Sequence, residues 1–481
     1  MENNKPQPSG VGIFNITDPK YGADSANSVI ERTAAIQKAI DDASEYGCTK
    51  GNKNGIVYVP AGVYEIGNLI LKSNTSFYLE GGAVLLASAS DKNIYSNNGH
   101  KSSMGMDYTW WISTEFEAIT DPAKGKYEVL SGSYDIKIFG RGTIDGNEKN
   151  MVRNLNFGNN TVVPIACSYF TMEGLTVTNS VMWSIVPVRS NDLRFSYLKM
   201  YNSLSPLRGE NDCIDVCESQ NVVVEHCIGI SLDDPFTTKA WPLTTGITVQ
   251  WPGFPEIVDN VVFDNCLSWT YCYGLKIGQG VDESHSNVTF KNSTVYDCAV
   301  GISIHHKYGR GTVENVTFDN ITIERVNNKN EVHRTWFTAF IQSADRGPGK
   351  IKNVTVKNID VLDKGTTGAK IFGYDENHIV DGITFENIRF FGSTKPANTL
   401  EQLDITNLNP YFANVFVKGD PTSAIQAIYF NSSDKVSITS NTDPEGGGVG
   451  IKGRDGGYAL YNNVDFGNGV DKIDVRLSSL G

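Results

Sequence analysis

The chain of 481 residues contains no apolar run close to the roughly 18–20 residues that a membrane-spanning helix needs. Its first residues, MENNKPQPSG, have no apolar signal-peptide core and are typical of a disordered leader or of what remains after a signal is removed. It also has no basic run, and 41 Lys and Arg against 54 Asp and Glu give a net charge of −13. This acidic balance argues against nucleic-acid and anionic-membrane partners.

Metal and cofactor motifs are absent as well. None of the eight cysteines belongs to a CxxC pair, which argues against a zinc site. Cys227, Cys266 and Cys298 follow strand-like runs, so core packing is favoured over disulfide formation. There is no EF-hand and no phosphate-binding loop, and we expect neither a metal nor a cofactor.

Helical periodicity is scarce and is limited to SVIERTAAIQKAIDDASEY (28–46). Elsewhere, short β-branched runs are separated by Gly, Pro and Asn, and one phrase recurs: VVVEHCIGI (222–230), VVFDNCLSW (261–269), VTFKNSTVY (288–296), VTFDNITIE (316–324), VTVKNIDVL (354–362) and ITFENIRFF (383–391). The aligned turn residues, which should adopt the left-handed conformation, are His226, Asn265, Asn292, Asn320, Asn358 and Asn387. Such a repeat predicts an all-β solenoid, a right-handed parallel β-helix.

Three aspartates are separated by one turn of that solenoid. Asp212 precedes Asp233 and Asp234 by 233 − 212 = 21 and 234 − 212 = 22 residues. One turn carries a residue about 4.8 Å along the axis, so these carboxylates should cluster on adjacent rungs. Close carboxylates raise the pKa of one while others stay ionised, which suits acid–base work on a glycosidic bond. Strict alternation would place Asp212 with inward-facing Ile214, so a bend must interrupt the strand.

Several stretches resemble glycoside hydrolase family 28, the polygalacturonase family: GRGTIDGN (140–147), NSVMWSIVPVRSNDLRF (179–195), ENDCIDV (210–216), SLDD (231–234) and GISIHHKYGRGTVENVTFDNITIE (301–324). YGADSANSVIERTAAIQKAI resembles the N-terminal cap helix of that family. The resemblance implies a pectin-lyase-like β-helix over residues 11–395. It also implies an inverting glycosidase in which Asp233 is the general acid while Asp212 and Asp234 activate water.

The chain departs from this family at its basic positions. The His-Gly motif falls at Tyr273-Gly274, and the Arg-x-Lys motif, which binds a uronate carboxylate, falls at Ser303-Ile304-His305. We therefore expect a substrate other than unsubstituted polygalacturonate. A dextranase- or isopullulanase-like α-glucanase is an alternative, because that related family uses three aspartates without the histidine.

Further residues are expected to contact sugar. An aromatic or basic side chain near the triad can stack on a sugar face or hold a hydroxyl, and the candidates are Trp183, Lys239, Tyr273, Lys276, His305 and His306. WWIST (110–114) is expected in an insertion that walls the cleft.

The C-terminal stretch 423–481 resembles the first half of a carbohydrate-binding module of family 6, a β-sandwich that is truncated here. Residues 396–422 are expected to form a connection. Together these features predict a secreted monomer that acts on a polysaccharide or oligosaccharide.

Two other functions stay open. A polysaccharide lyase would use the acid triad to hold Ca²⁺ and Lys276 or Arg310 as the base. A non-catalytic β-helix adhesin would bind the glycan without turnover.

Overall fold

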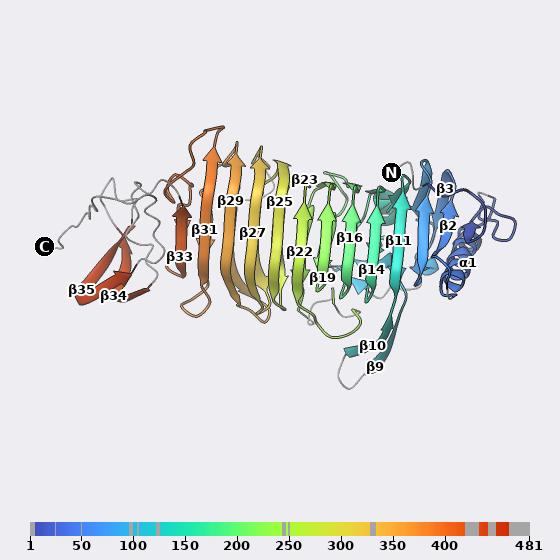
Figure 1. The fold of residues 1–481 in the computed structure, drawn as a ribbon, viewed down its shortest axis with the longest axis horizontal. Coiled ribbons are helices and arrows are strands. Elements are labelled where there is room, and N and C mark those ends of the chain that lie inside the picture. The colour runs from blue at the N-terminus through green and yellow to red at the C-terminus, as the bar shows by residue number, and fades with distance from the viewer. Residues whose placement is uncertain are drawn as a thin grey trace.

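The computed structural model describes residues 5–24, 26–49, 51–95, 100–102, 105–121, 126–242, 247–248, 251–327, 333–418, 432–440 and 449–460. Figure 1 shows strands stacked side by side along one axis, with helix α1 (Val29–Gly47) at the N-terminal end of the stack. This helix covers the stretch that was expected to be helical. Ser28 caps it, because its side chain accepts from the backbone N–H of Glu31 while the Glu31 carboxylate accepts from Ser28 N–H.

Parallel strands form three ladders along this stack. Two of them belong to one large sheet among the described residues, which contains β1 (Ile13–Asn15), β2 (Gly55–Val59), β3 (Gly62–Ile66), β5 (Thr75–Leu79), β6 (Ala83–Ala87), β11 (Tyr134–Gly140), β12 (Thr143–Asp145), β14 (Ser168–Glu173), β15 (Thr176–Thr178), β16 (Asn191–Ser196), β17 (Lys199–Tyr201), β19 (Gln220–Glu225), β20 (Ile228–Ser231), β22 (Val258–Asp264), β23 (Leu267–Thr270), β25 (His285–Asp297), β27 (Thr312–Ile323), β29 (Lys350–Val361), β31 (Val380–Phe390) and β33 (Phe412–Lys418).

The third ladder carries the candidate site. It begins with β4 (Leu69–Leu71), β8 (Asp107–Thr114) and β13 (Gly158–Val163), with β7 (His100–Lys101) beside β8. Isolated parallel bridges through Ile185 then join Val162 to Ile214. The ladder continues through β18 (Ile214–Cys217), β21 (Phe236–Ala240), β24 (Tyr273–Val281), β26 (Val300–Tyr308), β28 (Thr335–Ala344), β30 (Lys370–Phe372) and β32 (Asn407–Leu408).

Smaller elements complete the described chain. They are a hairpin of β9 (Phe116–Asp121) and β10 (Lys126–Gly132), an antiparallel pair of β34 (Ser432–Ser440) and β35 (Val449–Leu460), α2 (Glu148–Asn150), a 3₁₀ turn (Lys92–Ile94) and a π-helical turn (Met151–Leu155). In the residues described, no helix is both long and apolar enough to cross a membrane.

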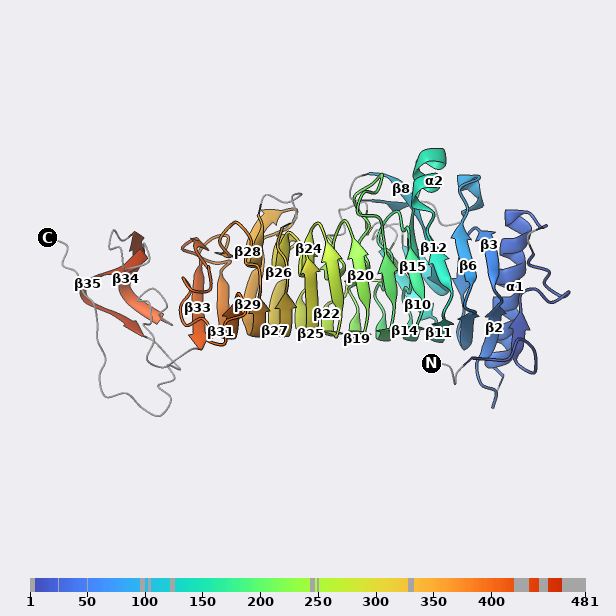
Figure 2. The same ribbon diagram turned by 90° about the horizontal axis from the view of Figure 1, so that it is seen from above.

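Stacked apolar side chains form the core inside the coil. The rings of Phe263, Phe290 and Phe318 lie one above another, with centroids 4.6 and 5.2 Å apart. A single rung cannot bury such a side chain on both sides, so each rung depends on its neighbours. The parallel strands, stacked rung on rung in all three ladders, form the right-handed parallel β-helix that the repeat predicted (Figure 2).

The recurrent turn residues form a second ladder, on the outside. All six aligned positions have positive φ, for example 53° at Asn265 and 51° at Asn292. The Asn320 side-chain amide donates to Asn292 Oδ1 at 2.9 Å, and Asn387 donates to Asn358 Oδ1 at 2.8 Å. Asn tolerates this backbone conformation and can bond to its equivalent on the next rung, as the sequence predicted.

Two expectations from the sequence were wrong. The β-helix does not end at 395, because β33 pairs in parallel with β31 and extends the stack through the stretch that was expected to be a connection. WWIST does not wall the cleft, because it belongs to β8, and Trp111 is fully buried in the core. All eight cysteines are free, and six of them are buried, including Cys227, Cys266 and Cys298.

The carbohydrate-binding module expected over 423–481 stays a prediction. Within it the structure describes only the antiparallel pair β34–β35, and the remainder lies outside the described residues.

Candidate active site

The three aspartates of the sequence analysis lie on adjacent rungs. Each precedes a strand of the third ladder, Asp212 before β18 and the Asp233–Asp234 pair before β21. The two strands are in parallel register, and the N–H of Cys213 donates to the backbone oxygen of Asp234 at 3.1 Å. One carboxylate oxygen from each of Asp233 and Asp234 lies within 4.8 Å of the other. The spacing of 21 and 22 residues therefore corresponds to one turn.

Buried polar side chains shape the bend that carries the aspartate pair. Asn211 Oδ1 accepts from the backbone N–H groups of Leu232 and Asp233, at 3.0 and 3.3 Å. The hydroxyls of Ser231 and Thr270 both donate to the backbone oxygen of Asp233 at 2.6 Å. These bonds replace ladder pairing at the bend, so the alternation of inward and outward side chains is interrupted there.

Lys239 lies between two carboxylates on β18 and its preceding bend. Its Nζ is 2.5 Å from Asp212 Oδ2 and 2.9 Å from Asp215 Oδ1. The same ammonium lies 4.2 Å from the ring centroid of Trp183. Burial lowers the pKa of Lys239, but Asp212 and Asp215 outweigh burial and raise it well above its usual value. Lys239 is therefore a fixed cation that holds Asp212.

Lys276 forms an ion pair with Asp234, as Lys239 does with Asp212. Its Nζ is 2.7 Å from Asp234 Oδ2 and 4.2 Å from the ring centroid of Tyr273. The backbone N–H of Tyr273 donates to Asp234 Oδ1 at 3.4 Å. Burial opposes the charge on Lys276, but Asp234 raises its pKa above the usual value.

The site thus has four carboxyl groups and two ammonium groups. Burial, followed by the charges of Asp212 and Asp234, raises the pKa of Asp233 well above its usual value. Burial and Asp212 do the same for Asp215. Burial also raises the pKa of Asp212, although Lys239 opposes this. Burial and like charge thus favour the protonated forms of Asp233 and Asp215, while Lys239 and Lys276 lie against Asp212 and Asp234.

Aromatic side chains cover this cluster. Trp183 and Trp241 stack with their centroids 6.3 Å apart, and Trp183 is 6% and Tyr273 9% exposed. The sequence had suggested exposed rings here. In the structure these rings shield the two lysines from water, and Asp233 is the partly exposed member of the triad.

The two adjacent histidines of β26 point in different directions. His305 stacks on Phe340 at 4.2 Å and has its Nε2 3.0 Å from Gln342 Oε1, while burial and Lys276 lower its pKa well below 6.5. His306 is fully buried, its Nε2 is 2.7 Å from Gly311 O, and burial lowers its pKa to about 4. His305 thus lies beside Tyr273, with ring centroids 5.9 Å apart, whereas His306 contacts the backbone at Gly311.

The sequence reading did not assign Asp215 and Asn211 to the site, and it did not place Cys272 there. Asp215 was part of the quoted ENDCIDV stretch. Outward parity on β18, in register with Thr237 and then Lys276, is the signal that would have identified it. Cys272 Sγ lies within 4.8 Å of oxygens of Asp233 and Asp234, the described group most like a metal site. The ammonium of Lys276 on Asp234 opposes a cation there.

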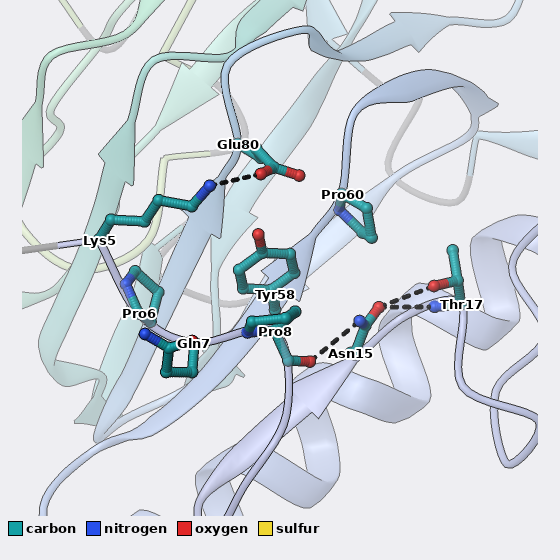
Figure 3. Close-up of a pocket in the computed structure, with 9 residues that line it drawn as sticks. All are labelled: Lys5, Pro6, Gln7, Pro8, Asn15, Thr17, Tyr58, Pro60 and Glu80. Atoms are coloured by element: carbon teal, nitrogen blue, oxygen red, sulfur yellow. Dashed lines mark hydrogen bonds and ion pairs between the residues drawn. The ribbon is translucent and has the colours of Figure 1, made fainter.

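A separate hollow lies at the N-terminal end of the stack, away from these strands. It is lined by Lys5, Pro6, Gln7, Pro8, Asn15, Thr17, Tyr58, Pro60 and Glu80, with an ion pair of 2.7 Å between Lys5 and Glu80 (Figure 3). It contains no carboxylate pair and no histidine, and it contributes nothing to the aspartate cluster.

Known proteins share this fold. A polygalacturonase from Erwinia carotovora ssp. carotovora superposes with a TM-score of 0.54 at 16% identity, over 82% of this chain and 94% of that one. A family 28 exopolygalacturonase from Yersinia enterocolitica gives 0.53 at 18% identity, over 86% and 78%. At these identities the comparison shows the fold alone.

Sequence comparisons go further. A probable exopolygalacturonase B from Neosartorya fischeri is 25% identical over 292 residues, which is 56% of this chain and 61% of that protein. The chain thus spans about three fifths of the length of that curated relative. Residues 48–408 match the sequence model of a family described as Glycosyl hydrolases family 28. Because this match covers most of the chain, the protein belongs to glycosyl hydrolase family 28.

Proposed function

We propose that the protein cleaves a glycosidic bond of a polysaccharide with inversion, using Asp233 as general acid and Asp212 with Asp234 as the pair that activates water. A water oxygen attacks the anomeric carbon opposite the leaving group and gives its proton to a carboxylate. The bond between the anomeric carbon and the glycosidic oxygen breaks, and that oxygen takes the proton of Asp233. Proton and electron counts then balance without a covalent intermediate.

Asp212 is the better-placed acceptor of the water proton. Both oxygens of Asp234 have donors, from Tyr273 N–H and from Lys276. Asp212 gives one oxygen to Lys239, whereas its buried Oδ1 has no hydrogen-bond partner among the described residues. A buried acceptor without a partner is costly unless water or a substrate supplies one. This arrangement supports a water held beside Asp212 Oδ1.

The observation that carries the proposal is the placement of three carboxylates on adjacent rungs, with a lysine on each of Asp212 and Asp234 and a pKa well above the usual value on Asp233. The test is the Asp233→Asn variant, which should keep substrate binding and lose turnover. Proton NMR of the first product formed by the wild type should show the anomer opposite to that of the substrate. A product that retains the configuration would refute inversion.

We also propose that unsubstituted polygalacturonate is a poor substrate. The Ser303 hydroxyl lies 2.8 Å from that of Thr338, and His305 is neutral, so neither supplies the charge that a uronate carboxylate needs. A neutral glycan, such as an α-glucan, fits this pair better. Rates on polygalacturonate, dextran, pullulan and xylogalacturonan, with sizing of products, test this substrate choice.

Polygalacturonate cleavage is the second candidate, because relatives carry the name exopolygalacturonase. One observation favours it: Lys370 Nζ lies 4.1 Å from the ring centroid of Phe340, which stacks on His305. This lysine is in the same row as Ser303 and Thr338 and could supply a cation two rungs away. Efficient release of galacturonate oligomers, abolished by Lys370→Met, would establish this candidate over the neutral glycan.

The lyase hypothesis has less support than hydrolysis. Lys276, one of its two candidate bases, is buried against Asp234 and has a raised pKa, which disfavours the neutral amine that a base requires. Formation of an unsaturated uronate, seen as absorbance near 235 nm and lost in EDTA, would revive it.

A further inference from the structure

A ribbon of exposed apolar side chains crosses consecutive rungs beside the candidate active site. Tyr201 on β17 is 57% exposed, Ile228 on β20 is 38% exposed and Tyr296 on β25 is 44% exposed. Ile230 on β20 and Trp269 on β23 are partly exposed between them. We call these five residues the aromatic ribbon. Most large apolar side chains of the described chain lie in the core, so this grouping on one outer face is unusual.

Strand register places the members of the ribbon in order along the β-helix axis. Tyr201 pairs with Ile230, and Ile230 pairs with Trp269 on the next strand. The rings of Trp269 and Tyr296 meet edge to face, with centroids 5.3 Å apart. Neighbouring strands are about 4.8 Å apart, which is close to the length of one pyranose unit in a glycan chain. The ribbon thus offers one apolar contact for each rung and each sugar.

The ribbon continues into the candidate active site. Only Ser231 and Leu232 separate Ile230 from Asp233, and Leu232 is partly exposed. The backbone N–H of Tyr271, also partly exposed, donates to Leu232 O at 3.2 Å. The strand that carries Trp269 therefore meets the aspartate bend directly.

We propose that the aromatic ribbon binds a segment of the polysaccharide substrate that lies outside the bond to be cleaved. This inference rests on the proposed action on a polysaccharide. The chemical class it selects is a glycan chain whose pyranose rings present apolar C–H faces, because these faces stack on Tyr and Trp while the hydroxyls stay in water. A charged glycan gains little from the ribbon itself, since its five side chains carry no charge.

Two features favour a glycan over a second protein. The ribbon is one or two side chains wide, whereas a stable protein interface buries roughly 800 Å² on each partner. It also lies close to the aspartate bend, because Asp233 follows Ile230 by only three residues, so a long chain held at the active site has the ribbon beside it. The ribbon would then hold a long substrate and leave a short one unaffected.

The test is affinity electrophoresis of the Asp233→Asn protein in gels that contain polygalacturonate, dextran or pullulan. We compare Trp269→Ala and Tyr201→Ala with Tyr134→Ala, a matched control that is 49% exposed on β11, on a different ladder of the large sheet. We expect the two ribbon variants to weaken retardation by at least one polymer roughly fivefold or more, and the control to stay within about twofold. Thermal unfolding of each variant checks that the fold is retained.

The second measurement uses the same three substitutions in the active protein. Trp269→Ala should raise KM for the polymer and leave kcat/KM for a trisaccharide of the same sugar unchanged. Three results would overturn the inference: equal retardation of Trp269→Ala and wild type, an equal loss of kcat/KM on polymer and trisaccharide, or no retardation of any protein. Self-association that Trp269→Ala abolishes would assign the ribbon to a second copy of the chain instead. Residual turnover in Asp233→Asn would refute the acid assignment alone.

Discussion

Comparing Lys239→Met with Asp215→Asn should show that the two carboxylates that share this lysine have different roles. Asp212 and Asp215 bind the same ammonium at 2.5 and 2.9 Å, yet the site assigns them different charges. In the proposed mechanism Asp212 is ionised to activate water, whereas burial and the charge of Asp212 raise the pKa of Asp215 well above the usual value and favour its protonated form. Lys239→Met therefore damages catalysis, and Asp215→Asn leaves the charge of the site unchanged.

The structure sets the size of each effect. Lys239 is 3% exposed and Asp212 1%, so loss of the lysine leaves a buried carboxylate without its cation. Breaking such a pair typically costs about 3–5 kcal/mol of stability. The same loss favours protonated Asp212, and a base that is protonated lowers kcat by ~10²–10⁴-fold. Asp215→Asn keeps an oxygen near Lys239, and we expect kcat/KM within about threefold of wild type, a change below 1 kcal/mol.

The assay is the pH profile of kcat/KM for both variants. Activity rises with pH as the base ionises, and Lys239 lowers the pKa of that base, Asp212. Without Lys239 the acidic limb should move to higher pH, while in Asp215→Asn it should stay in place. Urea unfolding of each variant separates lost stability from lost catalysis.

One result would refute this reasoning. If Asp215→Asn loses as much activity as Lys239→Met, Asp215 is ionised in the working enzyme, and the assignment of the second proton is wrong. An unmoved acidic limb in Lys239→Met would show in turn that Asp212 is not the base.

Three further predictions follow from the same structure. Asp233→Asn should lower kcat by ~10²–10⁴-fold or more with unchanged binding in calorimetry, and a rate near wild type would remove its role as acid. Wild-type kcat/KM on polygalacturonate should be low and should rise in a Ser303→Arg/His305→Lys variant, unless another cation already binds the uronate. Burial lowers the pKa of His285 to about 3, so stability is lost as pH falls below 6.5. At pH 4 the loss is (6.5 − 4) × 1.36, or about 3 kcal/mol. The His285→Gln variant should show a smaller loss of stability in urea titrations.

The fold could be predicted because its signal is repeated along the chain. Each rung shows the same Asn or His in the turn and the same apolar alternation, so errors at one rung are corrected by the others. WWIST was misplaced because it has no such phrase, and the pairing of β8 with β13 depends on contacts between distant segments. The boundary at 395 was placed too early because β33 carries the phrase NVFVKG, in which Gly419 stands where the preceding rungs have Asn or His.

The site could be predicted only as far as spacing allows. One turn of the coil brought Asp212 to Asp233 and Asp234, because register fixes the rung. Spacing does not show in which direction a side chain points. The contact of Lys239 with two carboxylates depends on that direction. So does the burial of His306 beside Gly311. Asn211 belongs to the quoted ENDCIDV stretch, and only its two bonds to the next bend reveal why it is there.

The two lysines connect the missing basic residues to the choice of substrate. Lys276 is in register with Ser303 on the next strand, so a cation stands one rung from the position where the family places its first basic residue. That cation is already bound to Asp234 at 2.7 Å and is shielded by Tyr273. A substrate carboxylate at Ser303 would have to compete with an enzyme carboxylate for Lys276, and taking that cation would leave the buried Asp234 without its ion-pair partner. The same ion pair that prepares Asp234 for catalysis therefore disfavours a uronate beside it, which is the physical basis for expecting a neutral sugar there.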